Sequence, residues 1–175
     1  MSYWNNNRNK RLLASLLAGV LAPTVAVGAV MATESTAEAA TKKARCDVHA
    51  VLASKAGEVG IPPTLEFLRQ QLSQDEFAVY KSFYLVEKIS AKTTLEKAAD
   101  FKFKSGNQLS LKLLGDDGAK LKLHAKMTSR DGASDLLNAD YSIVPKGVLV
   151  IAGGEFEDGG NSGRLFFAVQ CDRAG

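Results

Sequence analysis

The sequence predicts a mainly β fold: an antiparallel β-sandwich or partly open barrel of about six to eight strands, with one short helix near its start. Three observations lead to this expectation. Several stretches alternate apolar and polar residues with a period of two, turn residues separate these stretches, and strands do not alternate with helices as in a parallel α/β fold. The predicted domain is therefore an antiparallel sheet structure with one wet face.

The clearest alternation runs through residues 109–127, LSLKLLGDDGAKLKLHAKM. It predicts two half-buried strands joined by a turn, because residues two apart share one face of a strand. A three-residue turn at Asp116–Gly118, with Gly118 in the left-handed conformation, keeps the leucines together. A two-residue turn would instead set Leu113 against Lys122 and split the apolar face. The chosen register predicts four facing pairs: Gly115 with Ala119, Leu113 with Leu121, Leu111 with Leu123, and Leu109 with Ala125.

Further strands are expected on both sides of this hairpin. Cys46–Ser54 carries apolar residues on both faces, so it predicts a central strand. The double proline 62–63 and the apolar spacing after it predict a helix over residues 65–73. The other expected strands cover residues 81–90, 99–104, 134–144, 147–152 and 164–171. Residues 147–152 look fully buried, and residues 153–163 form a long Gly-rich loop. The aromatic residues 77, 80, 83 and 84 are expected in the core, with the tyrosine hydroxyls reaching the surface, and an aromatic carbohydrate-binding platform is the alternative.

The first 39 residues predict a secretory signal. A basic start without acidic residues precedes an uncharged segment rich in Leu, Ala and Val, and small residues follow it. Cleavage is expected after Ala39, with Ala32 as the rival site and an uncleaved membrane anchor as the alternative. All of these place the remainder in the periplasm or outside the cell. The sequence thus divides into a leader over 1–39, a lead-in over 40–45 and one domain over 46–175.

The two cysteines, Cys46 and Cys171, lie near the two ends of the predicted domain. In an exported chain such a pair predicts a disulfide. Cys46 begins one expected strand and Cys171 ends another, so antiparallel neighbours would bring the two together at one end of the sheet. The alternative is that the cysteines are two free thiols or two metal ligands. The metal alternative lacks further ligands at a suitable spacing from the two cysteines.

Charge indicates a balanced surface with one basic feature. The formal net charge is +3, and removal of the leader leaves about +2, which is too balanced to imply a nucleic-acid partner by itself. A nucleic-acid partner is disfavoured because no aromatic residues interleave with the lysines of the hairpin. The predicted register places Lys112 opposite Lys122 and Gln108 opposite Lys126. The resulting face is either a solvated or protected surface, or a site for an anionic envelope polymer. Its candidate binding residues are Lys112, Lys120, Lys122, His124 and Lys126.

Catalytic candidates are few. His49 and Asp47 are two apart on one expected strand, and a structural histidine is the alternative to a base. The loop segment Glu155–Asp158, with Asn161, offers oxygen ligands for calcium, and its carboxylates are candidates for acid catalysis; a solvated turn is the alternative. No metal-binding or nucleotide-binding motif was recognised, so no cofactor is expected.

Three segments together carry a family resemblance: VHAVLASKAG followed by IPPTLEFLRQQL, then FAVYKSFYLVEK, then GVLVIAGG with GRLFFAV. The chain resembles an uncharacterised family of small exported bacterial β-rich proteins. In this sequence Glu155 follows Gly153-Gly154 where that family more often has proline. The resemblance implies one exported β-rich domain and carries no activity or catalytic residue.

The sequence therefore favours an exported, non-enzymatic binding or scaffolding domain of the bacterial cell envelope. Its partner would be an anionic polymer or another envelope protein, and the membrane would be contacted only through an uncleaved leader. One alternative is an envelope hydrolase that uses His49 and Asp47, or the Glu155–Asp158 loop. Another is an inhibitor or assembly subunit that acts through a strand edge.

Overall fold

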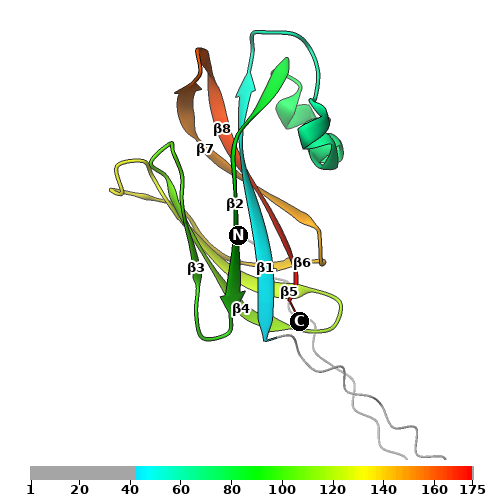
Figure 1. The fold of residues 1–175 in the computed structure, drawn as a ribbon, viewed down its shortest axis with the longest axis vertical. Coiled ribbons are helices and arrows are strands. Elements are labelled where there is room, and N and C mark those ends of the chain that lie inside the picture. Colours follow the sequence, from blue (N-terminus) through cyan, green and yellow to red (C-terminus); the bar gives the residue numbers. More distant parts are fainter. Residues whose placement is uncertain (1–41, 175) are drawn as a thin grey trace, which may run out of the picture. The chain divides into compact units, whose positions relative to one another are not determined.

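The computed structural model describes residues 42–174, so the predicted leader with its two cleavage sites lies outside the described residues. The described residues form eight strands in two four-stranded antiparallel sheets, which pack as a sandwich (Figure 1). The predicted mainly β fold is confirmed.

Sheet A has the strand order β2-β1-β8-β7. Its strands are β1 (Lys43–Ser54), β2 (Ser82–Thr94), β7 (Val148–Asp158) and β8 (Asn161–Arg173). Strand β1 lies between β2 and β8, which confirms the prediction of a central strand. It begins at Lys43 rather than at Cys46, because its first residues pair with the ends of both neighbours.

Sheet B has the order β3-β4-β5-β6. Its strands are β3 (Ala99–Lys102), β4 (Gln108–Asp116), β5 (Leu121–Thr128) and β6 (Asp135–Ile143). The seven apolar side chains predicted for the inner face of β4 and β5 are all buried, and the lysines between them point to solvent. The alternation in the sequence thus decides which face of sheet B is wet.

The main core lies between the two sheets. Leucines of β4 and β5 pack there with Leu165, Phe167 and Val169 of β8. Cys46 and Cys171 are direct partners across β1 and β8, and their sulfur atoms form the predicted disulfide. The bridge joins residues 125 apart in the sequence. A disulfide is compatible with an extracytoplasmic location.

A helical segment covers part of the other face of sheet A (Figure 1). It consists of a 3₁₀ turn over Pro63–Leu68, helix α1 over Arg69–Leu72 and a second 3₁₀ turn over Asp75–Phe77. Leu65, Leu68 and Leu72 point into a second core with Val51 and Ala53 of β1. The predicted helix is present, and its first part takes the tighter 3₁₀ form. Of the four aromatic residues expected inside, Phe77 and Phe83 are buried, and Tyr80 and Tyr84 are partly exposed.

The predicted register of the β4–β5 hairpin is wrong by two residues. Leu113 faces Leu123 and Leu111 faces Ala125, while Gly115 faces Lys122. The turn runs through residues 117–120, and a bulge at Leu114 absorbs the odd residue, so the leucine face stays whole. Gly118 has the predicted positive φ of 84°. Lys112 therefore faces His124 instead of Lys122, and Gln108 faces Thr128 instead of Lys126.

Two predictions for the C-terminal third are also wrong. Residues 148–152 belong to edge strand β7, where only Ile151 is fully buried. The expected loop over 153–163 is a continuation of β7 and β8. Its strands meet at a two-residue turn, Gly159-Gly160, in which both residues have positive φ, as a tight hairpin requires. Glycine-rich composition here indicates backbone freedom within a hairpin rather than an irregular loop.

Candidate functional site

The outer face of sheet B carries the predicted basic residues. Lys112 of β4 and Lys122, His124 and Lys126 of β5 occupy outward positions, and Lys120 lies in the turn between the two strands. The lysines are exposed, because their strand neighbours on either side point into the core. We call these five residues the lysine face. The structure therefore brings the sequence-predicted binding residues onto one surface.

Carboxylates accompany part of the lysine face. His124 Nδ1 lies 2.7 Å from Asp140 Oδ1 of β6, and Lys126 Nζ lies 3.3 Å from Asp135 Oδ2. Lys122 Nζ is 3.9 Å from Asp117 Oδ2 in the turn. The two partners on β6, Asp135 and Asp140, were not anticipated, because strand β6 was not assigned a neighbour from the sequence.

Two lysines of the lysine face have no such partner. Among residues 42–174, neither Lys112 nor Lys120 has a carboxylate within 4 Å. The turn itself is held by Asp117, whose pKa is lowered chiefly by the hydrogen bond from the backbone N–H of Lys120. Lys112, in the middle of β4, and Lys120, in the turn, are thus the two lysines of the lysine face that no carboxylate of the described residues neutralises.

His49 and Asp47 share one face of β1, as predicted, but His49 is buried. Its side chain is 5% exposed and packs against the ring of Phe67, with 4.5 Å between ring centroids. Burial lowers the pKa of His49, and the charge of Lys88 lowers it further. A ring in this position is closed to a substrate and acts as packing under the helical segment.

Asp47 is engaged in ion pairs of its own. Its carboxylate lies 3.0 Å from Lys88 Nζ and 3.6 Å from Arg45 Nε. Burial works to raise the pKa of Asp47, yet hydrogen bonds from Ser90 and Lys88 leave it below its ordinary value. These contacts hold Asp47 as a charged structural group rather than as a partner that activates His49.

The carboxylates of residues 155–158 lie along strand β7. Glu155 faces Arg164 and Asp158 faces Asn161 across the hairpin, so they are spread along the strand. Within the described part of the chain, no three His, Cys, Asp or Glu side chains are grouped closely enough to hold a metal ion. The hairpin geometry separates the oxygen atoms that a flexible loop would have gathered.

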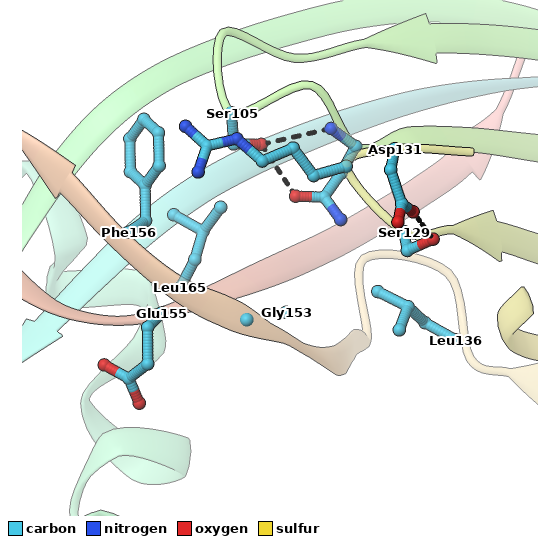
Figure 2. Close-up of a pocket in the computed structure, with 11 residues that line it drawn as sticks. Ser105, Ser129, Asp131, Leu136, Gly153, Glu155, Phe156 and Leu165 are labelled. Carbon is cyan, nitrogen blue, oxygen red and sulfur yellow. Dashed lines mark hydrogen bonds between the residues drawn. The ribbon is translucent and has the colours of Figure 1, made fainter. Parts of the chain in front are cut away.

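A cleft that the sequence did not indicate lies where the β3–β4 and β5–β6 turns approach β7. A cavity of about 350 Å³ is lined by Leu136, Leu165, Phe156, Gly153 and neighbouring residues (Figure 2). A second cavity of about 790 Å³ shares Arg130, Glu155 and Phe156 with it. We call the two cavities together the end cleft.

The end cleft combines an apolar wall with Arg130, the one cation of the described residues that lines both cavities. The guanidinium of Arg130 lies 5.8 Å from the centroid of the Phe156 ring. Ser105 and Asn107 form a polar part of the wall. The hydroxyl of Ser105 donates to Asn107 Oδ1 (2.8 Å), and the Asn107 amide donates to the carbonyl of Thr128 (3.2 Å), so these polar groups have hydrogen-bond partners within the protein. The signals that could have indicated this site are the Gly153-Gly154 pair, which lies in strand β7 rather than in the expected loop, and Arg130 in the β5–β6 turn.

Comparisons of the chain with protein-family models, with curated proteins and with solved structures found no match. Among residues 42–174, no helix has the length and apolar character needed to cross a membrane. We therefore infer function from the two surfaces described above, the lysine face and the end cleft.

Proposed function

We propose that this chain is an exported, non-enzymatic binding or scaffolding domain of the bacterial cell envelope, and that it contacts an anionic polymer through the lysine face. The observation that carries the proposal is the exposed row on β4 and β5, in which Lys112 stands without a carboxylate partner. An antiparallel face on which cations recur at alternate strand positions suits an extended polyanion, whose charges also repeat.

The carboxylates near the lysine face are compatible with this role. Lys122 with Asp117 and Lys126 with Asp135 are exposed pairs on both sides. Exposed ion pairs contribute roughly 0–1 kcal/mol, so an incoming polyanion can displace them at small cost. Because these interactions are screened by salt, we expect binding to be weak and to fall steeply as ionic strength rises.

The test compares polymer binding by two double variants of equal charge change. Lys112→Glu with Lys122→Glu alters the lysine face, and Lys81→Glu with Lys97→Glu alters two exposed lysines outside it. The probe is alginate, a polyuronate, with neutral dextran as the reference polymer. At about 0.7 kcal/mol for each reversed charge, the first variant should bind alginate about tenfold more weakly than the wild type. The control variant should bind much as the wild type does.

Two outcomes would contradict the proposal. Equal losses in both double variants would show that only net charge matters, and unchanged alginate binding by the first variant would remove the lysine face from the interaction. Circular dichroism of both variants establishes that each is folded.

The geometry argues against one specific version of each alternative function. A histidine-based hydrolase requires an accessible base, and His49 is buried under Phe67. Assembly by strand addition at the last strand is not favoured, because β8 is paired on both sides by β1 and β7. Strand addition elsewhere would use the edge strands β2, β7, β3 or β6.

A further inference from the structure

We infer that the end cleft is a second binding site, for a small amphiphilic anion whose apolar part enters the smaller cavity and whose carboxylate or phosphate meets Arg130. The end cleft shares no residue with the lysine face, so this inference does not depend on whether the lysine face binds a polymer. Three features carry the inference: the apolar lining, the glycine-built wall and the available guanidinium.

The smaller cavity has the size and lining of a ligand site. Its volume of about 350 Å³ lies at the lower end of the range for small-molecule pockets, about 300–1,000 Å³. Leu165 is buried, Phe156 is partly buried, and Leu136 is 44% exposed at the border. An alkyl group placed against these three side chains would remove apolar surface from water on both partners.

Strand β7 makes room for this cavity by means of glycine. The register of β7 against β8 shifts between Ala152 and Glu155, so Gly153 and Gly154 form a bulge. A Cβ on Gly153 would come within 3.0 Å of the Leu165 carbonyl oxygen and of the Phe167 ring. The glycine therefore lets the strand approach the core closely and leaves this part of the wall without a side chain.

Arg130 supplies the charge that selects an anion. It lines both cavities and rests over the Phe156 ring, and no carboxylate of the described residues lies within 4 Å of it. The neighbouring Asp131 is already engaged. It accepts hydrogen bonds from the Ser129 hydroxyl (2.6 Å) and the Ala133 N–H (3.0 Å). These bonds, that of Ser129 foremost, lower the pKa of Asp131, so it stays ionised within the turn.

The remaining acidic side chain of the smaller cavity does not oppose an anion there. Figure 2 shows the carboxylate of Glu155 directed away from Phe156 and Leu165. Its partner across the hairpin is Arg164, which lines the larger cavity together with Lys55. A planar guanidinium with an apolar pocket beside it favours a carboxylate or phosphate that carries an alkyl group.

Isothermal titration of the full chain, with its disulfide intact, tests this inference. The probes are octanoate and octyl phosphate, with 1-octanol, acetate and inorganic phosphate as references. We expect both octyl anions to bind more tightly than octanol, and acetate and inorganic phosphate to give no measurable binding. Octyl phosphate against inorganic phosphate also separates a lipid-like ligand from a free anion.

Matched variants assign the binding to the end cleft. Arg130→Gln and Leu136→Asp should each weaken octanoate binding about tenfold or more, since each removes one of the two recognition elements. The controls are Arg69→Gln and Leu114→Asp, at residues that line neither cavity; Leu114 is 44% exposed, like Leu136. The controls should bind as the wild type does.

Several results would overturn the inference. Absence of octanoate binding at millimolar concentration, or equal losses in the control variants, would remove the site. Inorganic phosphate binding as tightly as octyl phosphate would show that the apolar cavity takes no part. Alginate binding should be unchanged in Arg130→Gln, which keeps a failure here distinct from a failure of the lysine-face proposal.

Discussion

A buried ion pair joins the two sheets at the turn of the β4–β5 hairpin, and its removal should be costly. Arg173 of β8 donates to both carboxylate oxygens of Asp116, at 2.6 and 2.9 Å. Arg173 also donates to the carbonyl of Gly118, and the Gly118 N–H donates to Asp116. The perturbation we consider is Arg173→Met, which keeps a long side chain and removes the charge.

The magnitude follows from the burial of the two partners. The Asp116 side chain is 3% exposed, so without Arg173 its negative charge would be left in a poorly solvated position. Removal of one partner from a buried pair costs roughly 3–5 kcal/mol. Because the Arg173 side chain is 31% exposed, water can enter part of the space it vacates, and we expect the lower end, about 3 kcal/mol.

The double variant Asp116→Asn with Arg173→Met separates the pair from its surroundings. Asp116→Asn alone should lower the free energy of unfolding by less than Arg173→Met does. The partly exposed guanidinium left by Asp116→Asn can turn to water, whereas the buried carboxylate left by Arg173→Met cannot. The double variant should be more stable than the sum of the single losses predicts, by about 1.5–2 kcal/mol of coupling.

Equilibrium unfolding in urea, followed by far-ultraviolet circular dichroism, measures these free energies. The only tryptophan of the sequence, Trp4, lies outside the described residues, so circular dichroism is preferred to tryptophan fluorescence. Arg69→Met is the matched control, because Arg69 pairs with Glu66 at the exposed surface. If Arg173→Met shifts the unfolding midpoint no more than Arg69→Met does, the reasoning from burial is wrong.

Three further results are expected in the same assay. The bridge between Cys46 and Cys171 closes a loop of 125 residues, so its reduction should lower the free energy of unfolding by about 5 kcal/mol on the chain-entropy model. A loss below about 1 kcal/mol would contradict that model for this protein. Gly163→Ala should destabilise the fold strongly, because a Cβ there would meet the Ala53 carbonyl oxygen of β1. Gly115→Ala is the control and should be tolerated, because a Cβ there meets open space; equal effects of the two variants would refute the close approach of β8 to β1 at Gly163. The pKa of His49 is lowered in the folded state, so the unfolded chain binds more protons as pH falls below about 6.5, and stability should fall there. Replacement of His49 by Phe should flatten that dependence, and an unchanged pH profile would show that His49 is not its source.

Much of the fold was predictable because its signals are local. Alternation in β4 and β5 shows which residues face the core, and the apolar run of β1 shows that it is covered on both sides. The disulfide followed from two cysteines at the ends of two predicted strands. Each of these inferences needs only the period of a strand or the count of a residue type.

The hairpin register was not predictable in the same way. Shifts of two residues leave every leucine on the same face, so the sequence pattern cannot distinguish them. The bulge at Leu114 and the contact of Asp116 with Arg173 accompany the register that the structure adopts. The register matters for function, since it places Lys112 opposite His124 rather than opposite Lys122.

The candidate sites also differ in whether local sequence signals or contacts between distant segments define them. The lysine face is a property of one hairpin and was found from its sequence, whereas its carboxylate partners on β6 were not. The end cleft joins Arg130 in one turn of sheet B to Phe156 in sheet A, residues with no shared periodicity. The burial of His49 likewise depends on Phe67 in the helical segment.

By itself the sequence determined the β class, the wet and dry faces of the strands and the pairing of the cysteines, because periodicity and residue type act over a few positions. Only the tertiary structure decided the register, the ion pair between the sheets and the end cleft. Those features depend on which distant segments meet, and that is set by the packing of one sheet on the other.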